Sequence, residues 1–250
     1  MNESDYLAGH YSLDDPWQEF AALGLATPRR AGWLISAALR LNPQWIAERK
    51  IQRLADAIAP FSRGRIPRAE WESICDDAHR AAVRLHHECE TSQNDELFMH
   101  LMNCTEVAQQ LVMWFRPELS IQRLPVTDVE WMVYRMAGMA ALRTTDGDGD
   151  AENAAYLEAE SAIRAIHREI YGNPFQMVAI PREVSTPTVV ALAESWLAQP
   201  DPTRDTTMLP ILADAAEDAG CAHQPLLQHL RSGGPHLPGC WAVEALLGYW

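Results

Sequence analysis

The chain has 250 residues, of which 48% are hydrophobic and 22% charged, and it carries a net charge of −14. This composition is typical of a globular protein with a sizeable core and argues against global disorder. The acidic balance argues against binding to a phosphate backbone; it suits a partner protein with a basic surface, or serves only to keep the protein in solution.

The first residues, MNESDYLAGHYSLDDPW, carry acids where a secretory signal needs cations followed by an apolar core. The longest apolar run, AGWLISAAL at 31–39, is too short to cross a bilayer. Five cysteines in a chain of this length do not indicate a disulfide framework. We therefore expect a cytoplasmic protein without a membrane segment.

Hydrophobic residues recur at helical spacing along nearly the whole chain. One stripe predicts a helix over 67–90 and consists of Trp71, Cys75, Ala78, Ala82, Leu85 and Cys89. Another predicts a helix that stops at Gly172 and consists of Leu157, Ile163, Ile166 and Ile170. Further helices are predicted at 14–24, 28–41, 46–59, 97–115, 129–142, 187–198, 206–219, 224–231 and 239–248. The sequence predicts an all-α, multi-helical fold with about nine to ten helices, and the only strand candidate is 177–180.

Two segments rich in turn residues interrupt this helical pattern. The stretch TTDGDGDAEN at 144–153 carries glycines and like charges, which predicts an exposed, mobile loop. The stretch GNPFQMVAIPREVSTPT at 172–188 is rich in proline and turn residues, which predicts a linker. The expected organisation is an N-terminal helical body (1–171), this linker, and a C-terminal helical module (189–250).

The acidic loop contains the start of a calcium-binding pattern. Asp146, Asp148 and Asp150 have the spacing of the first, third and fifth loop positions. The pattern then needs glycine and glutamate where this chain has Ala151 and Leu157. A loop that caps the following helix is the better interpretation.

A second candidate lies on the helix predicted at 67–90. Asp76, His79, His86 and Glu90 fall on one line, and two such pairs have spacings that can share a metal ion. Val83 interrupts the line, and a solvated helix flank is the alternative. Three cysteines lie on apolar stripes, where a free thiol behaves as a small hydrophobe; they are Cys75, Cys89 and Cys104.

The strongest candidate site lies near the C-terminus. Cys221, His229, His236 and Cys240 are spaced C-x7-H-x6-H-x3-C, and thiolates and imidazoles are the ligands that zinc prefers. Four protein ligands would make such a zinc structural. The preferred interpretation of this segment is nevertheless packing without metal: two short helices meet at a corner over 233–235, both thiols are buried, and His236 bonds to backbone at the corner.

The segments YGNPF, LPILADAAEDAGC and HLRSGGPHLPGCWAVEALLG carry a family resemblance. They resemble the closing signature of uncharacterised bacterial proteins that are abundant in planctomycetes, whose ends read NPF, LADALEDAGC and GPHVRGCW. LADAAEDAG is also similar to a repeat-companion module. The resemblance implies a helical fold and marks Cys221, His229, His236 and Cys240 as signature positions, and it implies no reaction.

The sequence contains no hydrolase or nucleotide-binding motif, so the leading hypothesis is a non-enzymatic helical adaptor or regulator without a cofactor. Three tryptophans near segment ends are candidate interface anchors: Trp17, Trp45 and Trp250. The alternatives are a metal-dependent enzyme using a His/Glu/Cys site and a module stabilised by structural zinc. Nucleic-acid binding ranks last, because it would depend on a small basic patch of Arg29, Arg30, Arg49, Lys50 and Arg53.

Overall fold

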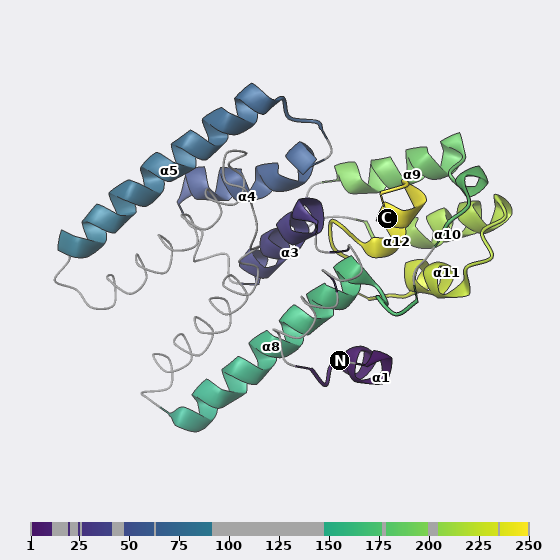
Figure 1. Cartoon of the computed structure of the whole chain (residues 1–250), viewed down its shortest axis with the longest axis horizontal. Coiled ribbons are helices and arrows are strands. Elements are labelled where there is room, and N and C mark those ends of the chain that lie inside the picture. Colours follow the sequence, from purple (N-terminus) through teal and green to yellow (C-terminus); the bar gives the residue numbers. More distant parts are fainter. Residues whose placement is uncertain are drawn as a thin grey trace. The chain divides into compact units, whose positions relative to one another are not determined.

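The computed structural model describes residues 2–11, 20, 25, 27–41, 48–62, 64–91, 148–176, 179–199, 205–234 and 236–249. All regular elements within these residues are helices, and no strand occurs among them, which confirms the predicted all-α class (Figure 1). None of the described helices is long and apolar enough to cross a membrane. The helices predicted at 97–115 and 129–142, and nearly all of 14–24, lie outside the described residues.

The chain forms two compact units. The first covers Ala8–Ile166, and the second consists of Asn2–Leu7 together with His167–Trp250. The division falls within one long helix, α8 (Gly149–Tyr171). The boundaries expected from the sequence, with a linker at 172–188, stay a prediction.

The first unit contains three described helices besides the first part of α8: α3 (Pro28–Arg40), α4 (Arg49–Ser62) and α5 (Arg68–Thr91). Helix α4 packs against both α3 and α5. The stripe predicted on α5 is buried as expected wherever its side chains are described, at Trp71, Cys75, Ala78, Ala82 and Leu85.

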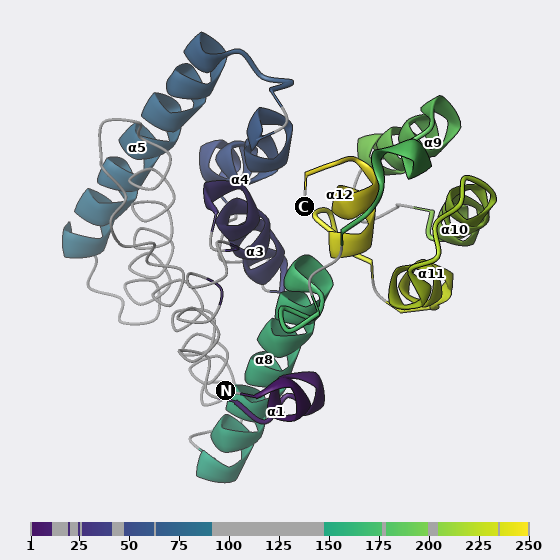
Figure 2. The same ribbon diagram turned by 45° about the vertical axis from the view of Figure 1, so that its right-hand side comes forward.

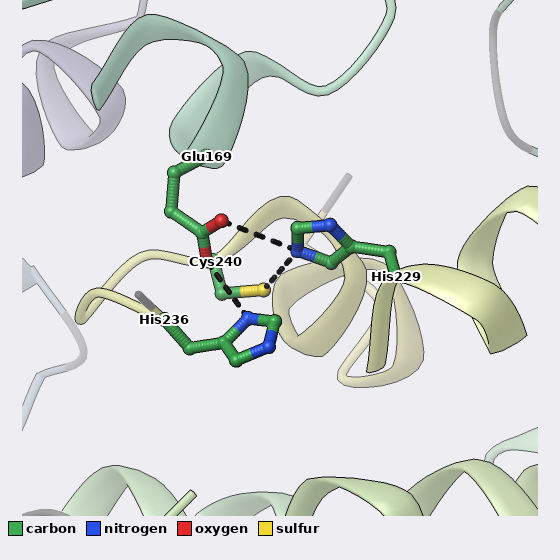
Figure 3. A group of neighbouring side chains, drawn as sticks. All are labelled: Glu169, His229, His236 and Cys240. Atoms are coloured by element: carbon green, nitrogen blue, oxygen red, sulfur yellow. Dashed lines mark hydrogen bonds and ion pairs between the residues drawn. The ribbon is translucent and has the colours of Figure 1, made fainter. Parts of the chain in front are cut away.

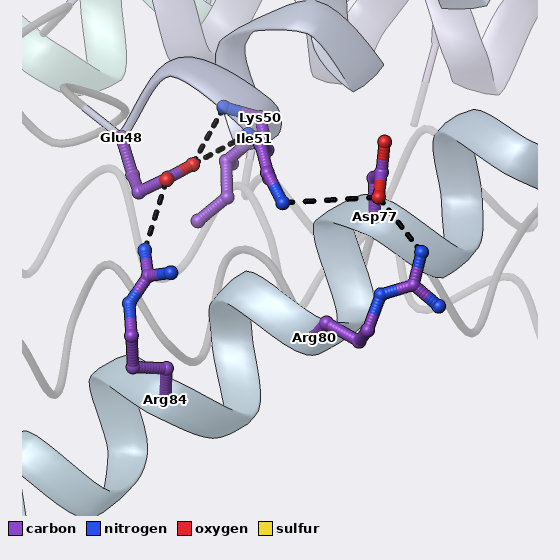
Figure 4. A network of polar contacts seen from close by, with 6 residues as sticks. All are labelled: Glu48, Lys50, Ile51, Asp77, Arg80 and Arg84. Carbon is purple, nitrogen blue, oxygen red and sulfur yellow. Dashed lines mark hydrogen bonds and ion pairs between the residues drawn. The ribbon is translucent and has the colours of Figure 1, made fainter.

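A polar network fixes the start of α4 against α5 (Figure 4). The Glu48 carboxylate accepts hydrogen bonds from the backbone N–H groups of Lys50 (2.6 Å) and Ile51 (3.2 Å), two of the donors that a helix leaves unpaired at its N-terminus. Its other oxygen accepts from Arg84 on α5 at 3.0 Å. Asp77 of α5 pairs with Lys50 at 3.8 Å. One carboxylate therefore caps α4 and ties it to α5.

Helix α8 begins earlier than the sequence indicated. Its first residue is Gly149, so the predicted mobile loop at 144–153 is wrong over 149–153, and 144–147 lie outside the described residues. The reason is capping: the Asp148 carboxylate accepts from the N–H of Asp150 at 3.0 Å. Leu157 was expected on the buried stripe, but it is 59% exposed. It lies roughly 120° around the helix from Ile163, since successive residues turn by about 100°.

The second unit contains the end of α8 and four short helices (Figure 2). They are α9 (Pro187–Ala198), α10 (Met208–Asp218), α11 (Gln224–Arg231) and α12 (Trp241–Leu246), preceded by the 3₁₀ turn η2 (Arg182–Val184). A Thr186 cap with Pro187 at the first helical position starts α9, as expected from its sequence. Apolar faces of all four helices share one buried cluster.

A short N-terminal helix, α1 (Glu3–Ala8), was not predicted. Its six residues are too few to show a helical stripe. Asn2 starts it, because the Asn2 side-chain oxygen accepts from the N–H of Asp5 at 2.9 Å.

Candidate metal centre

Four side chains of the second unit that can ligate a metal converge on one point (Figure 3). They are Glu169, His229, His236 and Cys240, and their ligand atoms all lie within 4.8 Å of one another. Across the described part of the chain this is the only group of three or more such residues. We call these four residues the EHHC cluster.

The local sequence explains how three members meet. His229 lies on α11, whose apolar face at Leu226, Leu227 and Leu230 is fully buried and fixes the helix on the core. The connection after α11 carries His236, and Cys240 is the residue immediately before α12. Packing of α11 against α12 therefore brings the imidazole of His229 to the thiol of Cys240.

Glu169 comes from the last turn of α8. It lies three residues after Ile166 and next to Ile170, so it shares their buried face and is only 7% exposed. Burial raises the pKa of the Glu169 carboxyl, but hydrogen bonds and charges from His229 and His236 outweigh burial, and the pKa is lowered. The backbone N–H of Leu237 also donates to Oε1 at 3.4 Å. The structure thus holds a buried carboxylate in its ionised form.

The two ring nitrogens of His236 have different partners. Nε2 lies 3.1 Å from the carbonyl oxygen of Ser232, which can only accept, so Nε2 carries a proton and donates it. Nδ1 lies 3.3 Å from Glu169 Oε1, which also accepts only. A neutral His236 would therefore direct a lone pair at a carboxylate. This contact needs either a proton shared between Nδ1 and Oε1 or a metal ion bound by both groups.

A single ring nitrogen of His229 contacts both the Glu169 carboxylate and the Cys240 thiol. Its Nε2 lies 3.3 Å from Glu169 Oε2 and 3.2 Å from Cys240 Sγ. A single proton on Nε2 can serve both acceptors only by sharing, whereas a metal ion would bind all three groups at once. The metal arrangement also resembles what proteins use elsewhere, because a ligating histidine commonly donates its other N–H to a backbone carbonyl, as His236 does to Ser232.

Part of the donor spacing matches the edges of a tetrahedral ion, and part is wider. Zinc lies about 2.0–2.1 Å from nitrogen or oxygen and about 2.3 Å from sulfur, which gives tetrahedral edges of roughly 3.3–3.6 Å. His229 Nε2 lies 3.3 Å from Glu169 Oε2 and 3.2 Å from Cys240 Sγ. His236 Nδ1 lies 3.3 Å from the other carboxylate oxygen, Oε1, so a carboxylate that binds through one oxygen supplies only one of the two 3.3 Å edges. The widest separation, 4.8 Å, has to close by roughly an ångström to match a tetrahedral edge. The four side chains, one thiol, two imidazoles and one carboxylate, are all of the types that bind zinc in proteins.

A catalytic cysteine is a poor description of the same residues. In a nucleophilic triad the histidine uses one nitrogen for the nucleophile and the other for the carboxylate. Here Cys240 and Glu169 both face the same nitrogen of His229. Cys240 is also fully buried, and burial together with the charge of Glu169 raises its pKa well above that of an ordinary thiol.

The structure brings together three of the four residues that the sequence singled out. His229, His236 and Cys240 belong to the EHHC cluster, while Cys221 is a buried free thiol that is not part of it. The fourth donor is Glu169, which the sequence analysis missed. A glutamate within the apolar stripe of a helix was the available signal, because a carboxylate on a buried face needs compensating partners.

The expected packing of the C-terminal helices is also present. Leu226, Leu227 and Leu230 share the buried cluster with Trp241, Val243 and Leu246. Both Cys221 and Cys240 are buried and reduced, and His236 bonds to backbone as predicted. Packing and metal binding are therefore compatible in this unit.

The other two candidate metal sites are the calcium pattern and the His/Glu line on α5. Among their described side chains, no three ligand groups lie close together. Asp148 caps α8 and Asp146 lies outside the described residues, so the calcium pattern gains no support. His79 is exposed on α5, and nothing is described of the side chains of His86 and Glu90.

Two residues of the predicted basic patch are buried or paired. Arg30 is buried, at 8% exposed, and Lys50 is paired with Asp77. Trp17, Trp45 and Trp250 lie outside the described residues. Comparisons with protein-family models, with curated proteins and with solved structures found no match to this chain.

Proposed function

We propose that residues 167–250 form a helical module stabilised by one structural zinc ion, held by the EHHC cluster. The observation that carries this proposal is the contact of His236 Nδ1 with Glu169 Oε1 at 3.3 Å, with Nε2 already committed to Ser232. A cation between the two groups would satisfy both. When bound, zinc would supply charge neutralisation and a cross-link between segments that are distant in sequence.

A structural role is supported by the closure of the site. Zinc with four protein ligands has no open position for water or substrate, unlike catalytic zinc, which keeps one. Three of the donors are less than a tenth exposed: Glu169, His236 and Cys240. The ion would join the last turn of α8 to the segment that contains α11 and the start of α12.

At the level of the whole chain, we propose a non-enzymatic protein that acts by binding another protein. The closed site supports this, and the net charge of −14 favours a partner with a basic surface. Membership of the planctomycete-type family and a cytoplasmic location remain part of this proposal. A His/Glu/Cys enzyme is the alternative, and it would require one donor of the cluster to leave the metal.

Elemental analysis and cobalt substitution test the zinc site. Purified chain should contain stoichiometric zinc, and cobalt exchanged into it should give a thiolate-to-cobalt charge-transfer band. Cys240→Ser should abolish this band because the only thiolate ligand is lost. Cys221→Ser is the matched control, since Cys221 is a buried thiol outside the cluster; its band should remain unchanged. A chain that binds neither metal would overturn the proposal.

A further inference from the structure

The four donors of the EHHC cluster differ in their exposure to solvent. The side chain of His236 is 1% exposed, that of Glu169 is 9% exposed, and Cys240 is completely buried. The side chain of His229 is 21% exposed. It reaches the cluster from α11 and contacts both Glu169 and Cys240 (Figure 3). A molecule dissolved in the solvent therefore has its best access to the cluster at His229.

The donors also differ in the hydrogen bonds that hold them from outside the cluster. His236 donates from Nε2 to the carbonyl oxygen of Ser232 at 3.1 Å, and Glu169 accepts from the backbone N–H of Leu237 at 3.4 Å. His229 uses Nε2 for the cluster, and among the described residues its Nδ1 has no hydrogen-bond partner. A ligating histidine is commonly oriented by a hydrogen bond at its other ring nitrogen. His229 lacks this restraint within the described part of the chain.

Ring contacts orient His229 instead. Its ring centroid lies 5.2 Å from that of the Trp241 indole and 4.9 Å from that of the His236 imidazole. Such contacts engage the faces and edges of the ring and leave Nδ1 uncommitted. The helix that carries His229 is fixed separately, because the apolar face of α11 is buried in the core. Rotation of this one side chain can therefore detach it from the cluster while α11 stays in place.

The consequence of detachment also differs among the donors. A carboxylate of Glu169 or a thiolate of Cys240 that left the metal would stay buried, where a charge without a partner is costly. A detached His236 would likewise remain inside the unit. The imidazole of His229 can reach water, which replaces the lost contacts with hydrogen bonds. Among the four donors, His229 therefore leaves the metal most easily. The ion then keeps three protein ligands, the number with which zinc accepts an external ligand.

We propose that His229 is the exchangeable ligand of the EHHC cluster and that its position on the metal takes a nitrogen donor of the imidazole type from outside the protein. The ion is loaded and removed at this position, without unfolding of the second unit. This inference rests on the proposed zinc module. It adds which donor leaves the metal and what kind of ligand replaces it.

Rescue by free imidazole tests the exchangeable position. Full-length His229→Ala and the matched variant His236→Ala are loaded with cobalt, and both keep Cys240 as the thiolate ligand. Imidazole should restore the tetrahedral cobalt spectrum of His229→Ala saturably and raise its cobalt affinity several-fold, because the missing side chain was exposed. The variant His236→Ala should not respond, since the side chain that it lacks is 1% exposed.

The possible outcomes separate this inference from the zinc module. Wild-type chain that binds no cobalt would overturn the zinc module, and the exchangeable ligand with it. Wild-type chain that binds cobalt, together with a His229→Ala variant that does not respond to imidazole at any concentration, would overturn only the exchangeable ligand. An equal response of His229→Ala and His236→Ala would also overturn it, because the external ligand would then not be specific to the exposed position.

A measurement on the unaltered zinc-loaded chain does not depend on any variant folding. Transfer of zinc to a coloured pyridylazo chelator, whose donors are nitrogens of a related type, is followed against chelator concentration. The rate should rise with chelator concentration and exceed the unfolding rate that urea kinetics give for the second unit, because the chelator attacks the ion in the folded protein. A transfer rate that is independent of chelator and equal to the unfolding rate would overturn exchange at His229.

Discussion

Glu169 and His236 lie 67 positions apart in sequence, yet Oε1 of one is 3.3 Å from Nδ1 of the other inside the second unit. Both side chains are less than a tenth exposed. A buried carboxylate this close to an imidazole must be compensated by a positive charge.

Glu169→Gln should lower the stability of the second unit and its metal affinity together. The amide keeps the size of the side chain but removes the negative charge that compensates the histidines. Breaking a buried charged pair by removing one partner costs about 3–5 kcal/mol. Urea unfolding and zinc titration measure the two effects. Glu160→Gln is the control on the same helix, since Glu160 pairs with Arg164 outside the cluster; wild-type zinc affinity in Glu169→Gln would show that this residue is not a ligand.

Gly172→Ala should destabilise the second unit through two effects. A left-handed φ of +58° strains any residue with a Cβ by about 1–2 kcal/mol, and the new Cβ would also clash with Trp241. Gly248→Ala separates the two, because Gly248 has φ = +75° and open space around its Cβ position. Thermal unfolding should show the larger loss for Gly172→Ala. Equal losses would mean that the indole moves aside freely.

Trp241→Ala should be among the most destabilising single changes in the second unit. The side chain is 6% exposed and lies beside His229, with ring centroids 5.2 Å apart. Removing a buried tryptophan side chain costs about 3–5 kcal/mol through the cavity that it leaves. Chemical unfolding checks the magnitude. A loss below about 1 kcal/mol, which is typical of surface positions, would contradict this packing.

Glu48→Ala should lower the stability of the first unit by about 1–2 kcal/mol, because α4 loses the side chain that caps its first turn. Glu88→Ala is the matched control: Glu88 also contacts Arg84, at 3.5 Å, but it caps no helix and its side chain is 52% exposed. Its effect should be small. Comparable losses in the two variants would assign the effect of Glu48 to the ion pair instead of the cap.

Metal-free and zinc-loaded protein should respond to pH in opposite directions above neutrality. Burial lowers the pKa of His236, but its hydrogen bond to Glu169 outweighs burial and the pKa is raised. The stability that His236 contributes is therefore full below its unfolded pKa of about 6.5 and is lost as pH rises through the folded value. Glu169, whose pKa is lowered, contributes fully above about pH 4.3 and less as acid protonates it.

Zinc reverses the trend on the alkaline side. The ion binds only deprotonated imidazole and thiolate, so the stability that it adds grows as protons leave. Melting temperatures from pH 5.5 to 8, with and without chelator, should diverge as pH rises. Parallel curves would mean that protons, not metal, compensate Glu169.

The helices of the second unit were predictable because each begins or ends at a clear signal. Pro187 after Thr186 starts α9, and Gly220, with φ = +93°, follows α10. His229, His236 and Cys240 could also be singled out, since they lie within one short segment of zinc-ligand residue types. Local sequence carries this information directly.

Glu169 could not be assigned to the same site from the sequence. It lies 60 or more positions before the other donors, and only the packing of α8 on α11 and the following segment brings it to them. Cys221 was chosen for its residue type, yet the backbone after α10 leaves it buried outside the cluster. Ligand type is a property of the sequence, whereas the partner of a ligand depends on tertiary structure.

The most direct test of the zinc module is the melting temperature of purified chain before and after chelator, followed by zinc readdition. We expect chelator to lower the melting temperature of the second unit by several degrees, Cys221→Ser to behave as wild type, and zinc to restore the loss. A melting temperature that stays unchanged when chelator removes bound zinc, or when zinc is added to zinc-free protein, would contradict the zinc module and leave the EHHC cluster as a metal-free buried charge network.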